Sequence, residues 1–486
     1  MRYSANRCDY VHSRVRLVNL CTQTGSLPMP PKIAIICPAE HTSSVEKIVE
    51  RHAYSGWRRD VRLVPIGLRD QQKPDRVSGL IRSLEQNHWH VHSGLDAITY
   101  VFLGGIRYDE KANQPNPLRF QLEFSGLAEF GNALQGLLRD KGLHWFDRVC
   151  ADLKDFWSQC AILPDAVERW LDQFKECGGH RWVGEGLLRQ LDLWPMHRVL
   201  GTFNTKAEVA ISSVTLALNL REGGKSGTAL WTPLKKHYKT RFPAWSGCEG
   251  QILDILKAVE ENRDILFFED GCISGSEAGI LLDAIRERMP RAPNGATSRV
   301  TAHYAYMTTL GLLCWDKRAA PLDGRISLRP PKNIEEVMTE EGRRAFKEDR
   351  FYDHTAGWDN TIDAPERFVR ARAFERAGIW GLGERTARER ADRAKAFCKE
   401  IGRQLYQNLL NTVSDPSQAR PGFKKTIEQR GLGVACLALT VAFSHSIPKS
   451  TLPVFWGSGP VSFSGKTLQW VPLFPGAAEG TALRDY

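Results

Sequence analysis

The sequence predicts an α/β protein built on parallel sheets. Short apolar runs alternate with amphipathic helical stretches between residues 33 and 103, and the same order recurs where the run Ile265–Phe268 meets a Gly-containing loop and a helix. Strands of parallel sheets are buried on both faces, so they read as continuous apolar runs of this kind. We therefore expect two α/β domains within the 486 residues.

Changes in this pattern mark the expected domain boundaries. Three apolar runs, Ile33–Cys37, Val61–Ile66 and Ile98–Leu103, are predicted strands separated by helical stretches. Helix-spaced apolar and aromatic residues follow up to Leu191. In chain order the expected parts are a loose tail (1–30), a small α/β domain of unassigned role (31–122), a helical connector (123–200) and a larger α/β domain with a helical insert and a Pro- and Trp-rich C-terminal cap (201–476).

Composition and charge narrow the function classes. A hydrophobic content of 42% and a charged content of 25% are typical of globular proteins, and the longest apolar runs are too short to cross a bilayer. The eleven cysteines contain no C-x-x-C pair, which argues against a zinc ribbon, and we expect an unexported, cytoplasmic protein with reduced thiols. The net charge of +10 favours anionic partners, with a diffuse surface excess as the alternative.

The most informative stretch follows the predicted strand Ile265–Phe268. Glu269 and Asp270 come directly after this strand, and the loop Ser274-Gly275-Ser276 precedes a predicted helix. Ligands of open α/β sheets bind at the carboxyl ends of strands, where a helix N-terminus attracts a phosphate. The two carboxylates would then face paired sugar hydroxyls, with a magnesium ion reducing their repulsion. A ribose 5-phosphate group fits this pattern; the alternative is a core strand capped by acids in an ordinary βα unit.

A second Gly-rich loop, Gly223–Thr228, follows the predicted strand Val209–Leu220. It is not a Walker loop, because no glycine stands at the required distance before Gly224. Backbone N–H groups of such a loop can still hold a phosphate, with Lys225 adding a positive charge. A flexible surface turn is the alternative.

Two other patterns carry less information. The triplet His88-x-His90-x-His92 could bind a metal, but no acid or cysteine stands at ligand spacing, so a surface turn is the favoured interpretation. The largely helical region Ile334–Leu410 contains arginines between Arg385 and Arg403 that could touch nucleic acid, although mixed charge is also typical of a solvated helix face.

The end of the chain is rich in Pro and Trp. The basic stretch Arg325–Pro331 is predicted to be a break, and Val434–Phe443 is predicted to be a strand. Ser444–Trp456 and Trp470–Phe474 follow, and we expect them to form an ordered cap packed on the sheet.

In combination these motifs resemble the type I phosphoribosyltransferases, and more closely the phosphoribosyltransferase-like domains of bacterial conflict and antiphage systems, including retron-associated effectors. The resemblance runs from about Asp165 to Pro475. It implies that the protein binds phosphoribosyl pyrophosphate together with Mg²⁺. The implied roles are ribose recognition and catalysis by Glu269 and Asp270, binding of the 5-phosphate by Ser274, Gly275 and Ser276, and binding of pyrophosphate by Gly224, Lys225, Ser226 and Gly227.

One residue departs from the resembled pattern. Glu277 stands where that family carries Thr or Ser, and its charge would oppose a phosphate in the loop. Three functions therefore stay open: a phosphoribosyltransferase acting on a nucleobase, nucleotide or nucleic-acid end; a module that senses phosphoribosyl pyrophosphate or a nucleotide and acts through defence-system protein partners; and a nucleic-acid-binding effector.

Overall fold

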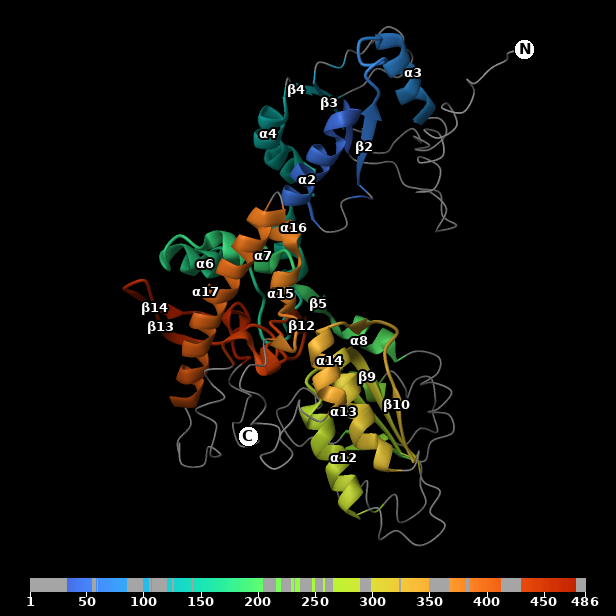
Figure 1. Cartoon of the computed structure of the whole chain (residues 1–486), viewed down its shortest axis with the longest axis vertical. Helices are drawn as coiled ribbons and strands as arrows, with labels where there is room; N and C mark the ends of the chain where they lie inside the picture. The colour runs from blue at the N-terminus through green and yellow to red at the C-terminus, as the bar shows by residue number, and fades with distance from the viewer. Residues whose placement is uncertain are drawn as a thin grey trace, which may run out of the picture. The chain divides into compact units, whose positions relative to one another are not determined.

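The computed structural model confirms a mixed α/β fold with parallel sheets. The chain divides into two compact units, residues 1–148 and residues 149–486, which are described separately (Figure 1). The described residues are 33–54, 58, 60–84, 99–104, 106, 120–124, 126–141, 143–203, 216–219, 229–230, 232–236, 247–249, 257, 265–288, 299–322, 325–348, 367–381, 384–411 and 430–477. The triplet His88-x-His90-x-His92 lies outside them.

The first unit is a four-stranded parallel sheet with strand order β2-β1-β3-β4. Alternate residues of β1 point to opposite faces: Ile33 and Ile35 belong to the core under α2 and α4, while Ile36 packs with residues of α3. The three strands predicted in this unit are confirmed. Its elements are β1 Ile33–Pro38, α2 Thr42–His52, β2 Val61–Ile66, α3 Pro74–Leu84, β3 Thr99–Leu103, β4 Phe120–Phe124 and α4 Leu127–Asp140, followed by α5 Trp145–Lys154 at the boundary of the units.

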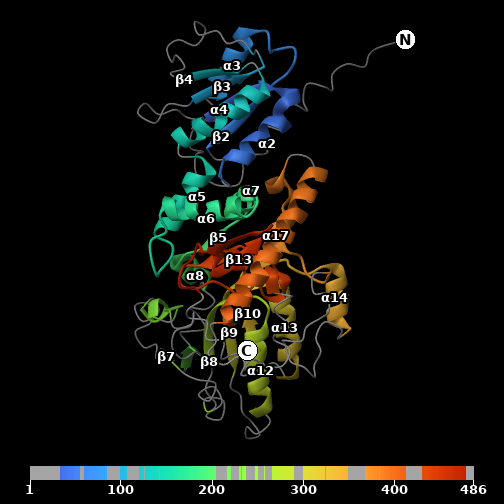
Figure 2. The ribbon, with the colours of Figure 1, turned by 90° about the vertical axis from the view of Figure 1, so that its left-hand side faces the viewer.

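The second unit contains a larger parallel sheet with strand order β10-β9-β8-β6-β7 and with β11 paired to β9. Helices α12 and α13 cover one face of this sheet (Figures 1 and 2), where Leu282 and Trp315 pack with Phe267 of β8. The elements are β6 Leu216–Asn219, β7 Gly247–Glu249, β8 Ile265–Cys272, α12 Ser276–Arg288, β9 Val300–Thr308, α13 Thr309–Ala319, β10 Ile326–Arg329, β11 Ile334–Glu335 and α14 Glu340–Lys347.

The first and last segments of the second unit contact each other. Strand β12 pairs in parallel with β5, although nearly 250 residues separate them in the sequence. The long helix α17 lies beside the β13–β14 hairpin in Figures 1 and 2, and Gln404 bonds the backbone of Ser462 there. The elements are α6 Pro164–Glu176, α7 Arg181–Leu188, β5 Asp192–Trp194, α8 Met196–Thr202, α15 Arg372–Glu375, α16 Ala377–Trp380, α17 Glu384–Asn411, β12 Val441–Phe443, β13 Gly459–Phe463 and β14 Lys466–Trp470.

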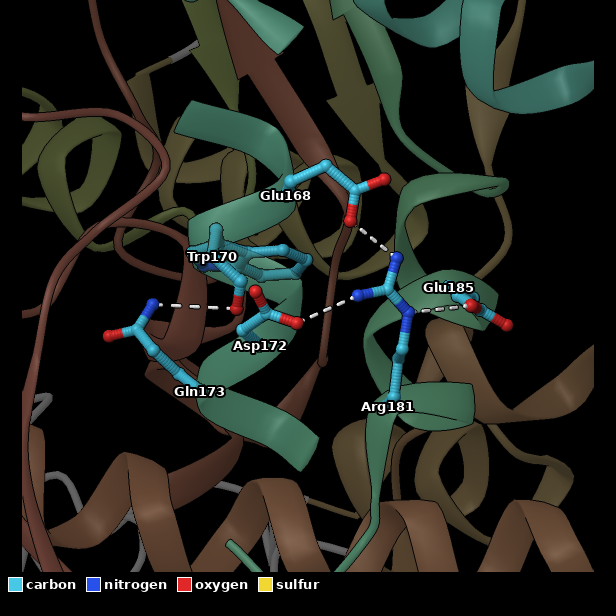
Figure 3. Close-up of polar contacts among 6 residues, drawn as sticks. All are labelled: Glu168, Trp170, Asp172, Gln173, Arg181 and Glu185. Atoms are coloured by element: carbon cyan, nitrogen blue, oxygen red, sulfur yellow. Dashed lines mark hydrogen bonds and ion pairs between the residues drawn. The ribbon is translucent and has the colours of Figure 1, made fainter. Parts of the chain in front are cut away.

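Helices α6 and α7 are tied together by one arginine. Arg181 at the start of α7 contacts three carboxylates: Glu168 at 2.6 Å, Asp172 at 2.9 Å and Glu185 at 3.1 Å (Figure 3). A planar guanidinium carries five N–H donors in a fork, so a single side chain can serve all three partners. Glu168 and Asp172 lie one turn apart on α6, so Arg181 joins the start of α7 to two successive turns of α6.

The Pro- and Trp-rich ending contains strands β12, β13 and β14 and several hydrogen-bonded indoles. We call residues 430–477 the C-terminal cap. The indole N–H groups of Trp170 and Trp470 both donate to the carbonyl of Val454, at 2.9 and 3.0 Å, and Trp157 donates to the carbonyl of Pro475 at 3.0 Å. Buried indoles need such acceptors. Trp170 of α6 and Trp157 are thereby bonded to the cap, while the bond of Trp470 lies within it.

Two element predictions are wrong. Val434–Phe443 is a strand only in β12, because it begins with a 3₁₀ turn, Val434–Cys436, in which Ala435 and Cys436 have φ of 56° and 54°. The backbone before this turn lies against α17, where a Cβ at Gly431 would stand 2.2 Å from the carbonyl oxygen of Lys399. The run is apolar because Cys436–Leu439 and the residues of β12 are buried. The predicted break Arg325–Pro331 contains the edge strand β10.

Candidate functional site

The two predicted acids lie near the carboxyl end of a central strand. Strand β8 has β9 on one side and β6 on the other, all three parallel, and residues Ile265 to Asp270 are buried. Glu269 and Asp270 are 7% and 8% exposed. Buried carboxylates are costly without hydrogen-bond donors or counter-charges. Their surroundings therefore decide what the site can do.

Asp270 is bound by the C-terminal cap. Its Oδ2 atom lies 3.0 Å from Nε2 of His445 and accepts a hydrogen bond of 2.8 Å from the hydroxyl of Ser446. The cap thus supplies two side chains to the predicted ribose site, from 175 residues further along the chain. Sequence reasoning singled out the stretch Ser444–Trp456 but did not connect it with Asp270, because no local pattern encodes a contact of that length.

The loop after β8 has the backbone geometry that the sequence suggests. Gly275 has φ of +76°, and helix α12 begins at Ser276. The first N–H groups of this 13-residue helix thus follow the two acids across the end of β8 and the loop at Gly275. A Cβ at Gly275 would stand 2.5 Å from Cβ of Cys314, so glycine is required both by conformation and by space. Ser274 is half-buried in this loop.

Thr308 fastens the same loop to the neighbouring helix. Its hydroxyl donates to the carbonyl of Ile273 and accepts from the N–H of Gly311 at 3.0 Å, which makes Thr308 the N-cap of α13. Gly311 in turn lies so close to β8 that a Cβ there would stand 2.2 Å from the carbonyl oxygen of Cys272. The loop is therefore held by contacts of both backbone and side chain.

Two polar aromatic side chains of β9 stay neutral beside β8. His303 pairs in register with Phe268, and burial lowers the pKa of its imidazole from 6.5 to about 4, with a smaller contribution from the charge of Arg329. Burial also raises the pKa of the Tyr306 phenol well above its ordinary value. Tyr306 packs against Trp194 and Phe443 of the paired strands β5 and β12. At neutral pH these two side chains of β9 therefore carry no charge.

The remaining predicted site residues lie wholly or partly outside the described part of the chain. Gly224, Lys225, Ser226 and Gly227 lie outside the described residues, as do the side chains of Ser276 and Glu277. Within the ranges that the structure covers, no group of three or more His, Cys, Asp and Glu side chains could hold a metal ion. Mg²⁺ often binds through one or two carboxylates together with substrate phosphates. Either Glu269 or Asp270 has the carboxylate chemistry for such a site, and the expected magnesium stays a prediction.

Several arginines of α17 pair with glutamates of the same helix, whereas Arg390 and Arg393 lie over the ring of Trp182. Arg385 contacts Glu389 at 3.0 Å, and Arg388 contacts Glu384 at 3.1 Å. Mixed-sign pairs of this spacing are typical of a solvated helix face. They give the nucleic-acid hypothesis no particular support. Among the described helices, none is both long and apolar enough to cross a membrane.

Comparison with known proteins gives one result. A family model described as PRTase-CE matches residues 167–475, which is more than half of the chain. The match begins within α6 and ends within the C-terminal cap, so it includes the acids of β8, the loop at Gly275 and the turn at His445–Ser446. No curated protein matches the chain significantly.

Proposed function

Because the chain belongs to the PRTase-CE family, a phosphoribosyltransferase-like family, we propose that it binds phosphoribosyl pyrophosphate at the junction of β8 and α12. One observation carries the proposal: two buried acids lie near the carboxyl end of a central parallel strand, which ends at Cys272 and is followed by a glycine loop and a helix N-terminus. In this assignment the loop Ser274-Gly275-Ser276 binds the 5-phosphate. Glu269 and Asp270 accept hydrogen bonds from the ribose hydroxyls.

The proposed reaction is transfer of phosphoribose. The bond between ribose C1 and the pyrophosphate oxygen breaks, and pyrophosphate leaves with the electron pair. A nitrogen or oxygen of a nucleobase, nucleotide or nucleic-acid end forms the new bond to C1, and its proton passes to solvent. The protein's contribution is to position the ribose and to stabilise charge at a C1 of oxocarbenium character. When bound, Mg²⁺ supplies positive charge beside Glu269, Asp270 and the pyrophosphate.

Asp270→Asn tests this assignment. An amide keeps the size of the side chain but loses the charge that accepts hydroxyl hydrogen bonds, so affinity for phosphoribosyl pyrophosphate should fall by at least about tenfold. Asp392→Asn, an exposed position on α17, is the matched control and should bind as wild type does. Mass spectrometry of wild-type protein incubated with phosphoribosyl pyrophosphate, magnesium and a metabolite extract identifies the acceptor. Equal affinity of the Asp270 variant and the control would refute the assignment.

The proposed pyrophosphate loop has a separate test. Lys225→Ala should weaken binding of phosphoribosyl pyrophosphate more than binding of ribose 5-phosphate, because only the first ligand carries the pyrophosphate that Lys225 would neutralise. Lys332→Ala, at an exposed position, serves as the control. Equal losses for both ligands would remove Gly224, Lys225, Ser226 and Gly227 from the site.

A second candidate, a sensor that binds the ligand without turning it over, is favoured by Glu277. A carboxylate in the first turn of α12 either opposes the 5-phosphate or turns outward, where the helix dipole favours it by about 0.3–1 kcal/mol. In the first case Glu277→Thr should tighten ligand binding without changing the melting temperature. In the second case the variant should melt slightly lower and bind unchanged, which would leave the transferase function preferred.

The biological role that we propose is that of an effector in bacterial antiphage defence, acting with protein partners. The motif resemblance over residues 165–475 supports it. Cells that express the wild-type chain together with its neighbouring genes should plate phage less efficiently than cells that express Asp270→Asn. Equal plating, with both proteins present at equal levels, would argue against a defence role that depends on this site.

A further inference from the structure

The contact between the C-terminal cap and Asp270 is nearly excluded from solvent. The side chains of His445 and Asp270 are 3% and 11% exposed. Oδ2 lies within hydrogen-bond distance of two cap side chains, His445 at 3.0 Å and Ser446 at 2.8 Å. Because a lone pair on Nε2 would face a carboxylate oxygen and be repelled by it, we assign the ring proton to Nε2, which donates a hydrogen bond to Oδ2. Hydrogen bonds to a charged acceptor are about twice as strong as those between neutral groups.

Backbone hydrogen bonds hold the turn that carries these two donors. Phe443 and Ser446 exchange backbone hydrogen bonds of 2.9 and 3.2 Å, and the N–H of Ser444 donates to the carbonyl of Trp194 at 3.1 Å. The ring of Phe443 packs against Tyr306 of β9. A Cβ at Gly271, the residue after Asp270, would lie 3.5 Å from that ring. The cap therefore reaches the end of β8 through a turn that is hydrogen-bonded within itself and to Trp194.

We propose that His445 and Ser446 are positioning residues for ribose recognition. They act through Asp270: by binding Oδ2, they set the rotation of the carboxylate that accepts the ribose hydroxyls. A site that recognises a diol needs a carboxylate with a fixed plane, and fixed donors around it supply that orientation before the ligand arrives. The inference rests on the proposed function and extends it, because it makes the cap part of the phosphoribosyl site.

The test compares two ligands on a small set of variants. Phosphoribosyl pyrophosphate uses Asp270, whereas inorganic phosphate requires only the loop at Gly275. Ser446→Ala and His445→Phe should each weaken binding of phosphoribosyl pyrophosphate by about tenfold and leave the affinity for phosphate within twofold. The conservative variants Ser446→Thr and His445→Gln keep a donor and should recover most of the affinity.

Ser444→Ala provides the matched control, because it removes a hydroxyl from the same turn while its backbone contacts remain. Its affinity for both ligands should equal that of wild type. If wild-type protein binds phosphoribosyl pyrophosphate and the cap variants match it, the positioning role is wrong and the proposed function stands. If the cap variants lose affinity for both ligands and also melt at a lower temperature than wild type, the contact is purely structural and the positioning role is likewise wrong. If wild-type protein does not bind phosphoribosyl pyrophosphate, the proposed function fails and this inference with it.

Discussion

His303 of β9 stacks on Phe268 of β8, with ring centroids 5.2 Å apart and planes inclined by 22°. The imidazole is 4% exposed, and its Nε2 has no hydrogen-bond partner among the described residues. Burial lowers its pKa from 6.5 to about 4, so the native state keeps this histidine neutral at pH values where the unfolded chain takes up a proton.

This stacked histidine should make the protein sensitive to mild acid. Because the native pKa lies below the unfolded value, the contribution to stability is complete above about pH 6.5 and is lost as the pH falls towards 4. His303→Phe keeps a ring on Phe268 and removes the titration. Urea unfolding should show that the variant gains about 2 kcal/mol relative to wild type between about pH 7.5 and about pH 5. A difference independent of pH would contradict the assignment.

Gly275→Ala should destabilise the protein. The substitution places a Cβ 2.5 Å from Cβ of Cys314 and forces alanine to φ of +76°, and together these effects should cost about 2–4 kcal/mol. Gly136→Ala in α4 has open space and should instead stabilise by up to about 1 kcal/mol. Differential scanning calorimetry measures both. A Gly275→Ala protein as stable as wild type would show that the loop is not held in this conformation.

The two threonine N-caps allow a paired test. Thr308 donates to the carbonyl of Ile273 in the loop before α12, while Thr339, the N-cap of α14, donates to Arg367 far along the chain. Replacing either by Val removes one cap and leaves one carbonyl without its donor, a loss of about 1–3 kcal/mol. Only Thr308→Val should also weaken binding of inorganic phosphate, because only Thr308 fastens the loop. If both variants bind phosphate equally well, anchoring of the loop by Thr308 does not contribute to phosphate binding and the prediction is wrong.

The residues around β8 show what a sequence alone predicts well. Ile265–Phe268 is buried on both faces, so its continuous apolar run points to a central parallel strand. Gly275 is likewise predictable, because a loop that turns sharply into a helix favours a residue with positive φ. Both features depend on a few neighbouring residues. The strand, the loop and the helix of the candidate site are therefore accessible from sequence.

The contacts that complete the site depend on distant parts of the chain. No spacing relates Asp270 to His445, because their meeting requires β12 to pair with β5 above the sheet. The run Val434–Phe443 misleads for a related reason: outside β12 its backbone bonds to distant residues, Leu437 to Arg372, Ala438 to Ala373 and Leu439 to Ser450, and not to a strand. Periodicity reports that a residue is buried but not what buries it.

Replacing Arg181 by lysine should destabilise the protein. Its guanidinium reaches Glu168, Asp172 and Glu185 at once and thereby joins α6 to α7. Lysine carries the same charge on a single nitrogen and cannot bridge three carboxylates in one plane. Arg181→Lys should therefore cost about 1 kcal/mol, a modest value because all four side chains are partly exposed. Chemical unfolding at low and high salt measures this cost, and a loss that disappears at low salt, where the ion pairs are strongest, would contradict the prediction.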